Sequence, residues 1–395
     1  MPPFRQLAVA LAGLVLGLGA GYASTVALDR AVLAYDRTDA EGVSQLLLLN
    51  IARARQNQPM HFTSVSSIAA TYRLSVSAGL GPALTGDRGA LLLPSLGGSA
   101  EENPTISIAP MQGEEFTQRL LTPFEERKLT LLLRQGYDVD ALLRLLGAEV
   151  RLEGADGGVA VHHNRPSDHD GYVRFRQVVA HLSAIQDAHS LHVEPLHFEH
   201  QWTVPAAAVT PESFGSVFKE YTLTYEPQRQ TYRVAKKVNG RVMITNYDPS
   251  SLPNAERVHL HELAEEAPYN DILVDIRPGH TGGEMPLRGR LRLRSFHEML
   301  NFIGRGIAEE PEFDVRPDPR SPPIQENPVR TLEILETKSL PSGVRSSVDL
   351  NGLRYAVKPQ AGYQWNAKAF SLLCQLFQMT VTTVPNAGPA ITIAK

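Results

Sequence analysis

The sequence predicts an α+β protein with a helical N-terminal third, a middle region that mixes strands and helices with β-hairpins, and a small α+β C-terminal piece. Apolar residues recur at helical spacing in several separate stretches of the chain, which is typical of amphipathic helices. Other stretches alternate apolar and polar residues, as half-buried strands do. Asn-Gly dipeptides at 239–240 and 351–352 stand between alternating stretches, where they favour two-residue hairpin turns.

The first 23 residues predict export. A short head with a positive charge precedes an uncharged run from Gln6 to Leu28, and this order is the pattern of a secretory signal. Gly21 and Ala23 are small residues that suit cleavage after Ala23. One interpretation of residues 1–23 is therefore a signal peptide that is removed.

The alternative is that the same segment is retained as a membrane anchor. Its apolar run reaches the roughly 20 residues that span a bilayer as a helix. Its glycines recur at a spacing that lets membrane helices approach closely: Gly13, Gly17 and Gly21. Tyr22 stands where a lipoprotein precursor carries its acylated cysteine, so these residues do not indicate a lipid anchor. Either interpretation places the protein in the periplasm or in the membrane-associated cell envelope.

The region from 24 to 155 is predicted to be mainly helical. A first helix is expected at 29–58, because apolar side chains recur on one face and Pro59 ends it. A strand is expected at 72–78, and the Gly-, Ser- and Pro-rich residues 79–102 are expected to form a loop. Three short helices should follow at 113–121, 125–135 and 138–148.

The region from 156 to 308 is predicted to be α+β. A helix is expected at 172–188, and a hairpin over 231–244 with its turn at Asn239 and Gly240. The other expected elements are strands at 258–263 and 287–293 and a helix, capped by Ser295, that runs to 307.

Two pieces complete the chain. Residues 309–330 are rich in proline and charge and are predicted to form a linker or an extended arm. Residues 331–395 are predicted as a β-hairpin plus a helix. The expected elements are a strand at 331–337, a hairpin around 351–352, a helix capped by Asn366, and short strands at 381–384 and 390–393.

Composition and motifs exclude several classes of function. The net charge is −4 with mixed signs, which indicates no nucleic-acid partner. The single cysteine, Cys374, has no partner for an internal disulfide and lies in an apolar helical stretch. The sequence contains neither a GxSxG nucleophile motif nor a Walker-type GxxxxGK loop, so no catalytic residue and no cofactor is predicted.

A histidine-rich segment leaves a metal site open as a hypothesis. Five histidines fall between 181 and 200, with Glu194 and Glu199 among them, and His259 and His261 form a second group. Imidazole and carboxylate groups are good zinc ligands. No HExxH and no paired CxxC motif accompanies them, so the metal ligands, if any, stay unknown. The five histidines are His181, His189, His192, His197 and His200.

An arginine-rich strand is the clearest candidate binding surface. Residues 287–294 alternate apolar residues or glycine with arginines, which places the arginines on one face of a strand: Arg288, Arg290, Arg292 and Arg294. One interpretation is a solvated edge strand that its charges keep from aggregating. The other is a surface for an anionic partner such as lipid headgroups. Nearby acidic residues are expected to neutralise it in part: Glu309, Glu310 and Glu312.

Several motifs together resemble a family of uncharacterised proteobacterial envelope proteins. They are AVLAYDR (31–37), LLLLNIARAR (46–55), HFTSVSSIAATY (61–72), ENPTISIAPMQGEEFTQRLLTP (102–123), DVDALLRLL (138–146), RSFHEMLNFIGRGI (294–307) and NAKAFSLLCQLFQM (366–379). Members commonly look like lipoproteins, whereas this chain has Tyr22 in place of the lipidation cysteine. The resemblance implies an envelope location and brings no catalytic residues.

These observations favour a non-enzymatic cell-envelope protein, a scaffold or subunit of a membrane-associated assembly. Its expected partners are other envelope proteins or further copies of itself, close to a membrane. Two alternatives stay open: an exported metal-dependent hydrolase that uses the histidine-rich segment, and a periplasmic binding module that holds an anionic lipid or ligand on the arginine strand.

Overall fold

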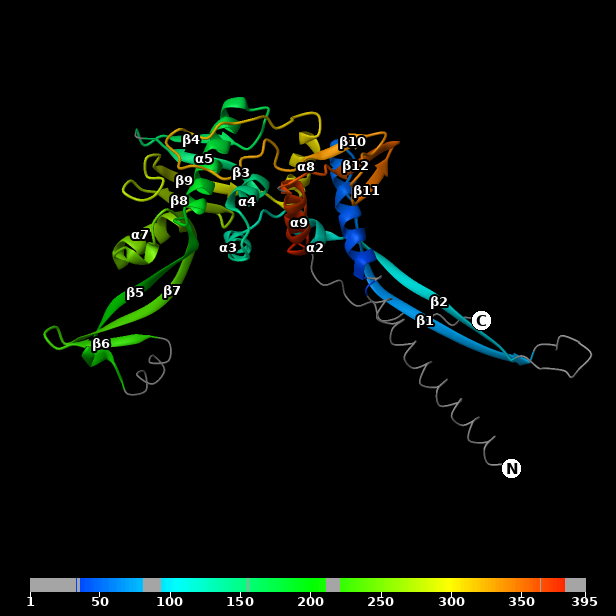
Figure 1. Cartoon of the computed structure of the whole chain (residues 1–395). Helices are drawn as coiled ribbons and strands as arrows, with labels where there is room; N and C mark the ends of the chain where they lie inside the picture. Colours follow the sequence, from blue (N-terminus) through cyan, green and yellow to red (C-terminus); the bar gives the residue numbers. More distant parts are fainter. Residues whose placement is uncertain are drawn as a thin grey trace, which may run out of the picture. The chain divides into compact units, whose positions relative to one another are not determined.

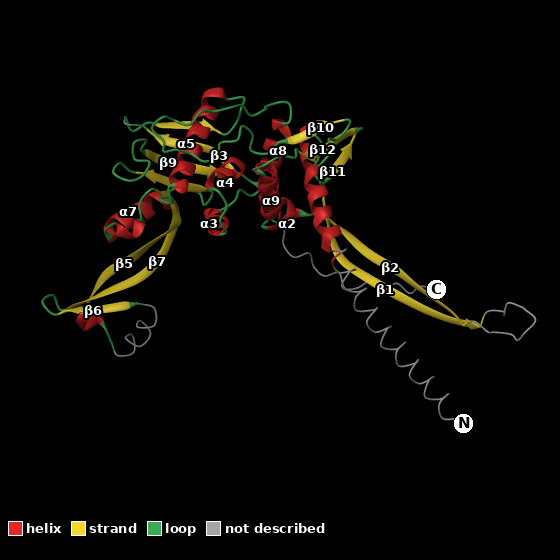
Figure 2. Ribbon diagram, viewed as in Figure 1, coloured by secondary structure: helices red, strands yellow, loops and turns green. Residues whose placement is uncertain are grey.

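The computed structural model describes residues 33, 36–80, 94–154, 156–210, 221–362 and 364–380. The chain has the predicted α+β class, with helices and strands interspersed along it (Figure 2). The export segment 1–23 and the strands expected at 381–384 and 390–393 lie outside the described residues. Among the described residues, no helix is both long enough and apolar enough to span a bilayer.

The chain divides into two compact units. The first comprises residues 1–46, 61–113 and 382–395, and the second comprises residues 47–60 and 114–381. These divisions fall at other positions than the boundaries expected from the sequence. Helix at residues 33 and 36–55 bears out the first predicted helix, which ends at 55 and not at 58; residues 29–32 lie outside the described part of the chain.

The first unit contains a two-stranded ribbon. Strands β1 (Phe62–Leu80) and β2 (Pro94–Met111) pair antiparallel along their whole length, from Phe62 opposite Met111 to Leu80 opposite Pro94. The strand expected at 72–78 is confirmed as part of β1. The loop expected at 79–102 is wrong, because residues 94–102 belong to β2. The Gly- and Ser-rich composition led to the wrong prediction of a loop, because the hydrogen bonds that pair β2 with β1 join backbone groups, and Gly and Ser residues also supply these.

The second unit is organised around a seven-stranded sheet (Figure 1). Its order is β4-β3-β9-β8-β7-β5, and β6 pairs with β7 on the edge opposite β5. Only β7 and β8 run parallel, while all other neighbours are antiparallel. The strands are β3 (Gly147–Glu153), β4 (Val159–His163), β5 (His192–Pro205), β6 (Thr222–Glu226), β7 (Thr231–Thr245), β8 (Asp271–Ile276) and β9 (Leu287–Leu293).

Helices cover this sheet and supply its core. The long helix α5 packs against α4 and β4, α7 packs against β5 and β7, and α3 contacts β7. All residues of β8 are buried, so the middle of the sheet is enclosed on both faces. The helices are α2 (Glu114–Leu121), α3 (Glu126–Arg134), α4 (Val139–Leu146), α5 (His169–Asp187), α7 (Asn254–Glu265), α8 (Phe296–Gly306) and the short η1 (Ala206–Ala208) and η2 (Pro249–Ser251).

The hairpin predicted at Asn239 and Gly240 is wrong. Strand β7 runs straight through both residues and pairs with β5, with a register shift between Pro195 and His197 of β5. Gly240 is needed for close packing instead of a turn: a Cβ there would lie 2.8 Å from a ring nitrogen of His261 and 2.9 Å from the ring of Phe198. The strand expected at 258–263 is also wrong, because those residues lie in α7.

A small three-stranded sheet and a helix follow near the C-terminal end of the second unit. The sheet has the order β10-β12-β11. The predicted turn is confirmed, because Asn351 (φ 54°) and Gly352 (φ 77°) both take the positive φ of a type I′ hairpin. The elements are β10 (Ile334–Thr337), β11 (Ser347–Leu350), β12 (Leu353–Val357) and α9 (Trp365–Gln378). Asn366 is not the cap of α9. It lies buried in the first turn, where its side chain accepts a hydrogen bond from the Glu333 amide.

Residues 309–330, predicted as a linker or arm, contain no helix or strand and lie within the second unit. We call residues 309–331 the strap. Two buried arginines on the helices beneath hold it: Arg144 donates to the Pro328 carbonyl (2.6 Å) and to Asn327 (2.8 Å), and Arg176 donates to the Val329 carbonyl (3.1 Å). Arg144 also pairs with the buried Asp140 at 2.7 Å. The strap is therefore bound through side chains, without a strand ladder.

Candidate functional site

The arginine strand is β9, and it is an interior strand. Because β9 lies between β3 and β8, the interpretation as a solvated edge strand is wrong. The alternation itself is confirmed: Leu287, Gly289, Leu291 and Leu293 are buried, whereas Arg288 and Arg292 are exposed and Arg290 is half-buried.

Carboxylates from neighbouring elements neutralise the arginine face. Arg288 pairs with Glu153 (3.1 Å), Arg290 with Glu266 (3.6 Å) and Arg292 with Glu149 (3.8 Å). The acidic residues expected to do this pair elsewhere: Glu309 with Arg55, Glu310 with Arg165, and Glu312 with Arg176. Ion pairs with exposed partners contribute little stability, so this face is a balanced polar surface.

Arg294 departs from the other three arginines. It follows the last residue of β9 and is only 6% exposed. Its guanidinium stacks 4.1 Å from the centre of the Phe302 ring, and its Nη2 donates to the Asn164 carbonyl. Its buried Nη1 has no hydrogen-bond partner among the described residues. Burial lowers the pKa of Arg294 to about 10, although the Glu298 charge opposes this shift.

Local sequence explains why Arg294 turns inward. Ser295 and Glu298 form a capping box that starts α8 directly after the strand, so Arg294 no longer follows the alternation of β9. The buried Asn164 side chain donates to the carbonyls of Arg144 (3.0 Å) and Gly147 (2.8 Å). These bonds hold the backbone of Asn164 in the position where its carbonyl meets Arg294.

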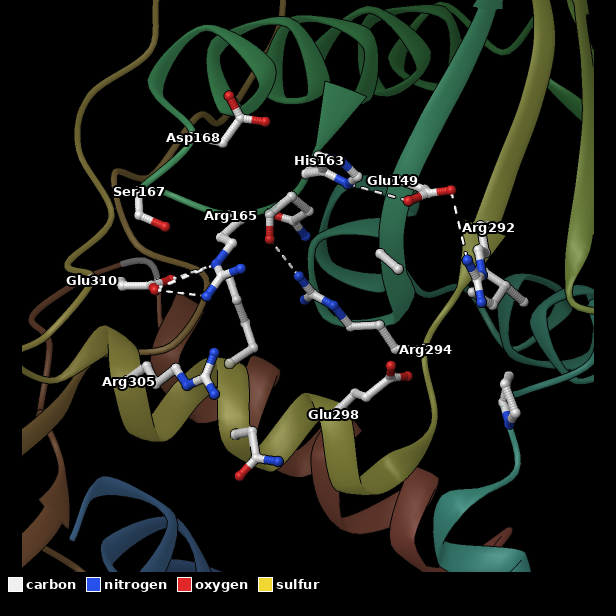
Figure 3. Close-up of a pocket in the computed structure, with 16 residues that line it drawn as sticks. Glu149, His163, Arg165, Ser167, Asp168, Arg292, Arg294, Glu298, Arg305 and Glu310 are labelled. Atoms are coloured by element: carbon white, nitrogen blue, oxygen red, sulfur yellow. Dashed lines mark hydrogen bonds and ion pairs between the residues drawn. The ribbon is translucent and has the colours of Figure 1, made fainter. Parts of the chain in front are cut away.

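Arg292 and Arg294 line a pocket with a volume of about 520 Å³. Figure 3 shows its walls: the ends of β3 and β4, the segment 164–168, the end of β9, α8 and the strap residue Glu310. Its lining residues are Pro123, Ala148, Glu149, His163, Asn164, Arg165, Ser167, Asp168, Arg292, Leu293, Arg294, Glu298, Asn301, Phe302, Arg305 and Glu310. The lining thus combines guanidinium and carboxylate groups with the apolar side chains of Phe302 and Leu293.

The four carboxylates of the pocket are already engaged. Glu149 pairs with Arg151 (2.6 Å) and contacts a ring nitrogen of His163 (3.1 Å), and Glu310 pairs with Arg165 (3.3 Å). Two more cap helices: Asp168 accepts from the amide of Gly171 in α5, and Glu298 accepts from the amide of Ser295 in α8.

The guanidinium groups are not all engaged in the same way. Arg165 and Arg292 have carboxylate partners. Arg294 and the exposed Arg305 form no ion pair with any carboxylate in the described part of the chain. The lining has four arginines and four carboxylates, and among the described residues Arg294 and Arg305 are the two of these arginines without an ion-pair partner.

The histidine-rich segment does not gather into one site. His181 is buried in α5, where its Nδ1 lies 2.8 Å from the Ser321 hydroxyl, and burial lowers its pKa to about 4. His192 lies 3.7 Å from Glu194, and His197 contacts the Asn239 side chain at 2.9 Å. Over the residues that the structure describes, no group of three His, Cys, Asp or Glu side chains has a geometry that could hold a metal ion.

Sequence reasoning found Arg292 and Arg294, named Glu310 only as an acidic neighbour of the arginine face, and missed the other residues of this pocket. Arg305 and Arg165 stand on separate elements, and only the fold brings them to the end of β9. A scan of family models, a search of curated proteins and a search of solved structures each returned no match to this chain.

Proposed function

We propose that the protein is a non-enzymatic component of the bacterial cell envelope, and that it is a subunit of a larger assembly, built with copies of itself or other envelope proteins. The observation that carries this proposal is the β1–β2 ribbon. Its two strands form a sheet of their own, with no third strand among the described residues. A two-stranded ribbon in water is at best marginally stable, and both of its edges are open to pairing. A partner chain that covers or extends the ribbon would complete it.

The envelope part of the proposal rests on the N-terminal residues and on the family resemblance. Residues 6–28 carry no charge, and a positive residue precedes them. The motifs shared with proteobacterial envelope proteins include 61–72 and 102–123, which overlap both strands of the ribbon.

A ribbon deletion tests the proposal. Thr63 and Pro110 face each other in the register, so a linker of about four residues with an Asn-Gly turn can replace residues 64–109. We expect the intact protein, extracted gently from the producing cells, to sediment as an assembly and the deletion variant to sediment as a monomer. The unfolding midpoint of the second unit should change little, because its core lies in 47–60 and 114–381.

The matched control replaces residues 81–93 alone and keeps both strands; it should assemble like the intact protein. The mass of the intact chain, measured in the same preparation, shows whether the chain begins at Met1 or near Ser24. Equal sedimentation of the intact and deleted proteins, both as monomers, would contradict the assembly proposal.

A further inference from the structure

We propose that the pocket at the end of β9 binds an oxyanion, such as the phosphate group of a small organic molecule or of a lipid, between Arg294 and Arg305. This inference goes beyond the assembly role, because it assigns a ligand class to a site that the ribbon does not include. The anionic partner predicted from the sequence is thus placed in the pocket at the end of β9, and not on the exposed arginine face.

The first step is the burial of an uncompensated charge. Arg294 is 6% exposed, and its Nη1 has no partner among the described residues. A buried guanidinium without a carboxylate is costly, and a buried donor without an acceptor adds to that cost. An oxyanion in the pocket would offset the first cost, because its charge opposes that of Arg294.

The second step is the charge balance of the lining. The four carboxylates are held by arginines, by a histidine contact or by helix caps, and none forms an ion pair with Arg294 or Arg305, although the charge of Glu298 acts on Arg294. In Figure 3 both guanidinium groups lie in the space between α8 and segment 164–168. Two guanidinium groups without ion-pair partners can together donate hydrogen bonds to the oxygens of one oxyanion.

The third step concerns the rest of the ligand. A volume of about 520 Å³ is far larger than one phosphate group, and Phe302 and Leu293 provide apolar surface. The ligand therefore carries an organic part beside its anionic group. Glu149 and Asp168 also line the pocket, and their charges would repel a long polyanion such as nucleic acid.

Thermal unfolding and calorimetry of the full chain test the proposal with three probes: inorganic phosphate, glycerol 3-phosphate, and phosphatidylcholine vesicles with or without phosphatidic acid. We expect phosphate-bearing probes to raise the unfolding midpoint by about 2–4 °C relative to chloride at equal ionic strength. Tighter binding of the soluble ester identifies a free metabolite, whereas binding of the phosphatidic acid vesicles alone identifies a lipid headgroup.

Three variants localise the effect. Arg294→Met should abolish the phosphate shift, and without phosphate it should be as stable as the parent or more stable, because a buried charge is exchanged for an apolar chain of similar volume. Arg305→Gln lies on an exposed position and should weaken binding about tenfold. Arg288→Gln, which lies on the same strand outside the pocket, should bind like the parent.

Two results would overturn the proposal. One is the absence of any phosphate-specific shift with all three probes up to about 10 mM, well above the ligand concentrations at which specific sites saturate. The other is a shift that persists in both Arg294→Met and Arg305→Gln. Loss of assembly in the ribbon deletion with phosphate binding intact would leave this inference standing, so the two proposals can fail separately.

Discussion

The molecule contains two long antiparallel ribbons, and they differ in whether further strands pair with them. In the part of the chain that the structure describes, the β1–β2 ribbon of the first unit pairs only with itself. The β5–β7 ribbon of the second unit continues a seven-stranded sheet: β7 pairs with β8 through Met243–Thr245, and β6 adds a third strand at its other end. In Figure 1, β5 and β7 extend away from the rest of their sheet toward β6. The second ribbon is thus completed within its own unit.

The base of the β5–β7 ribbon shows which contacts join a long ribbon to the rest of its sheet. A cluster of buried apolar residues joins it to α7 and β8: Leu196, Phe198, Met243, Leu260, Ala264 and Leu273. Arg241 is buried there and pairs with Glu126 at 2.8 Å, and its guanidinium also donates to four backbone carbonyls of residues 264–271. The far end has an aromatic pair, Tyr225 and Tyr232, at 5.1 Å. The contrast teaches that a ribbon of this length is held by an anchor and a third strand, and under our proposal β1–β2 obtains them from a partner.

The largest effect should come from the anchor itself. Arg241→Ala leaves Glu126 buried without its partner, and we expect a loss of about 3–5 kcal/mol in the free energy of unfolding, measured by urea titration. Burial raises the pKa of Glu126 while Arg241 opposes this rise. Without Arg241 the pKa should rise further, so the deficit should shrink as pH falls and Glu126 becomes protonated.

A double variant controls for packing at the same position. Arg241→Met with Glu126→Gln removes both charges and should recover part of the lost stability. A loss below about 1 kcal/mol for Arg241→Ala would mean that the ion pair does not anchor the ribbon, and the comparison of the two ribbons would lose its main support.

The second largest effect tests whether the stability of the β5–β7 ribbon depends on the helices that pack against its sheet. The folded-state pKa of His181 is about 4, below its ordinary value of 6.5, so the unfolded chain takes up a proton that the folded chain refuses. Stability should therefore be full above pH 6.5 and fall by about 2–3 kcal/mol as pH drops toward 4. His181→Gln should lack this part of the pH dependence.

Amide hydrogen exchange, measured across the same pH range, shows whether the loss of stability extends to the β5–β7 ribbon. If β7 depends on α5 and the sheet, exchange at residues 242–245 should quicken with the same pH dependence as exchange in α5. Unchanged exchange in β7 while α5 opens would show that the ribbon is stable without the rest of its sheet.

The smallest effect should come from the third strand. Tyr225→Ala removes one ring of the pair that joins β6 to β7, and we expect a loss of about 0.5–1 kcal/mol. Thr224→Ala, which faces Arg233 across the same two strands, is the matched control and should cost less. A larger loss at Thr224 than at Tyr225 would assign the stability of β6 to its polar face instead.

Short-range signals in the sequence were reliable where the structure is local. Ser295 and Glu298 are three residues apart and form the expected cap of α8, and Asn351 and Gly352 form the expected turn. The same dipeptide at Asn239 predicted a turn that does not form. There β7 pairs with β5, and His197 lies opposite Asn239 across a sequence separation of 42 residues. Pairing between distant segments outweighed the local preference for a turn.

For the candidate pocket too, the sequence predicted local features and did not predict contacts between distant segments. The alternation of 287–293 located β9 and pointed to Arg292 and Arg294. It also placed Arg294 on the exposed face, because the pattern does not reveal that the strand ends at Leu293. Arg305 and Asn164 enter the site only through the packing of α8 and the 164–168 segment against the end of β9, which no spacing in the sequence encodes.

The strap has a consequence for the order in which the chain can mature. Arg144 finds its acceptor at Pro328, 184 residues later in the chain, and Arg176 finds Val329, 153 residues later. Until synthesis has passed these residues, both guanidinium groups lack these carbonyl acceptors, so the packing of α4 against α5 lacks part of the hydrogen bonding that stabilises it. A chain that is threaded unfolded across a membrane from its N-terminus would thus delay its final packing until most of its length had crossed.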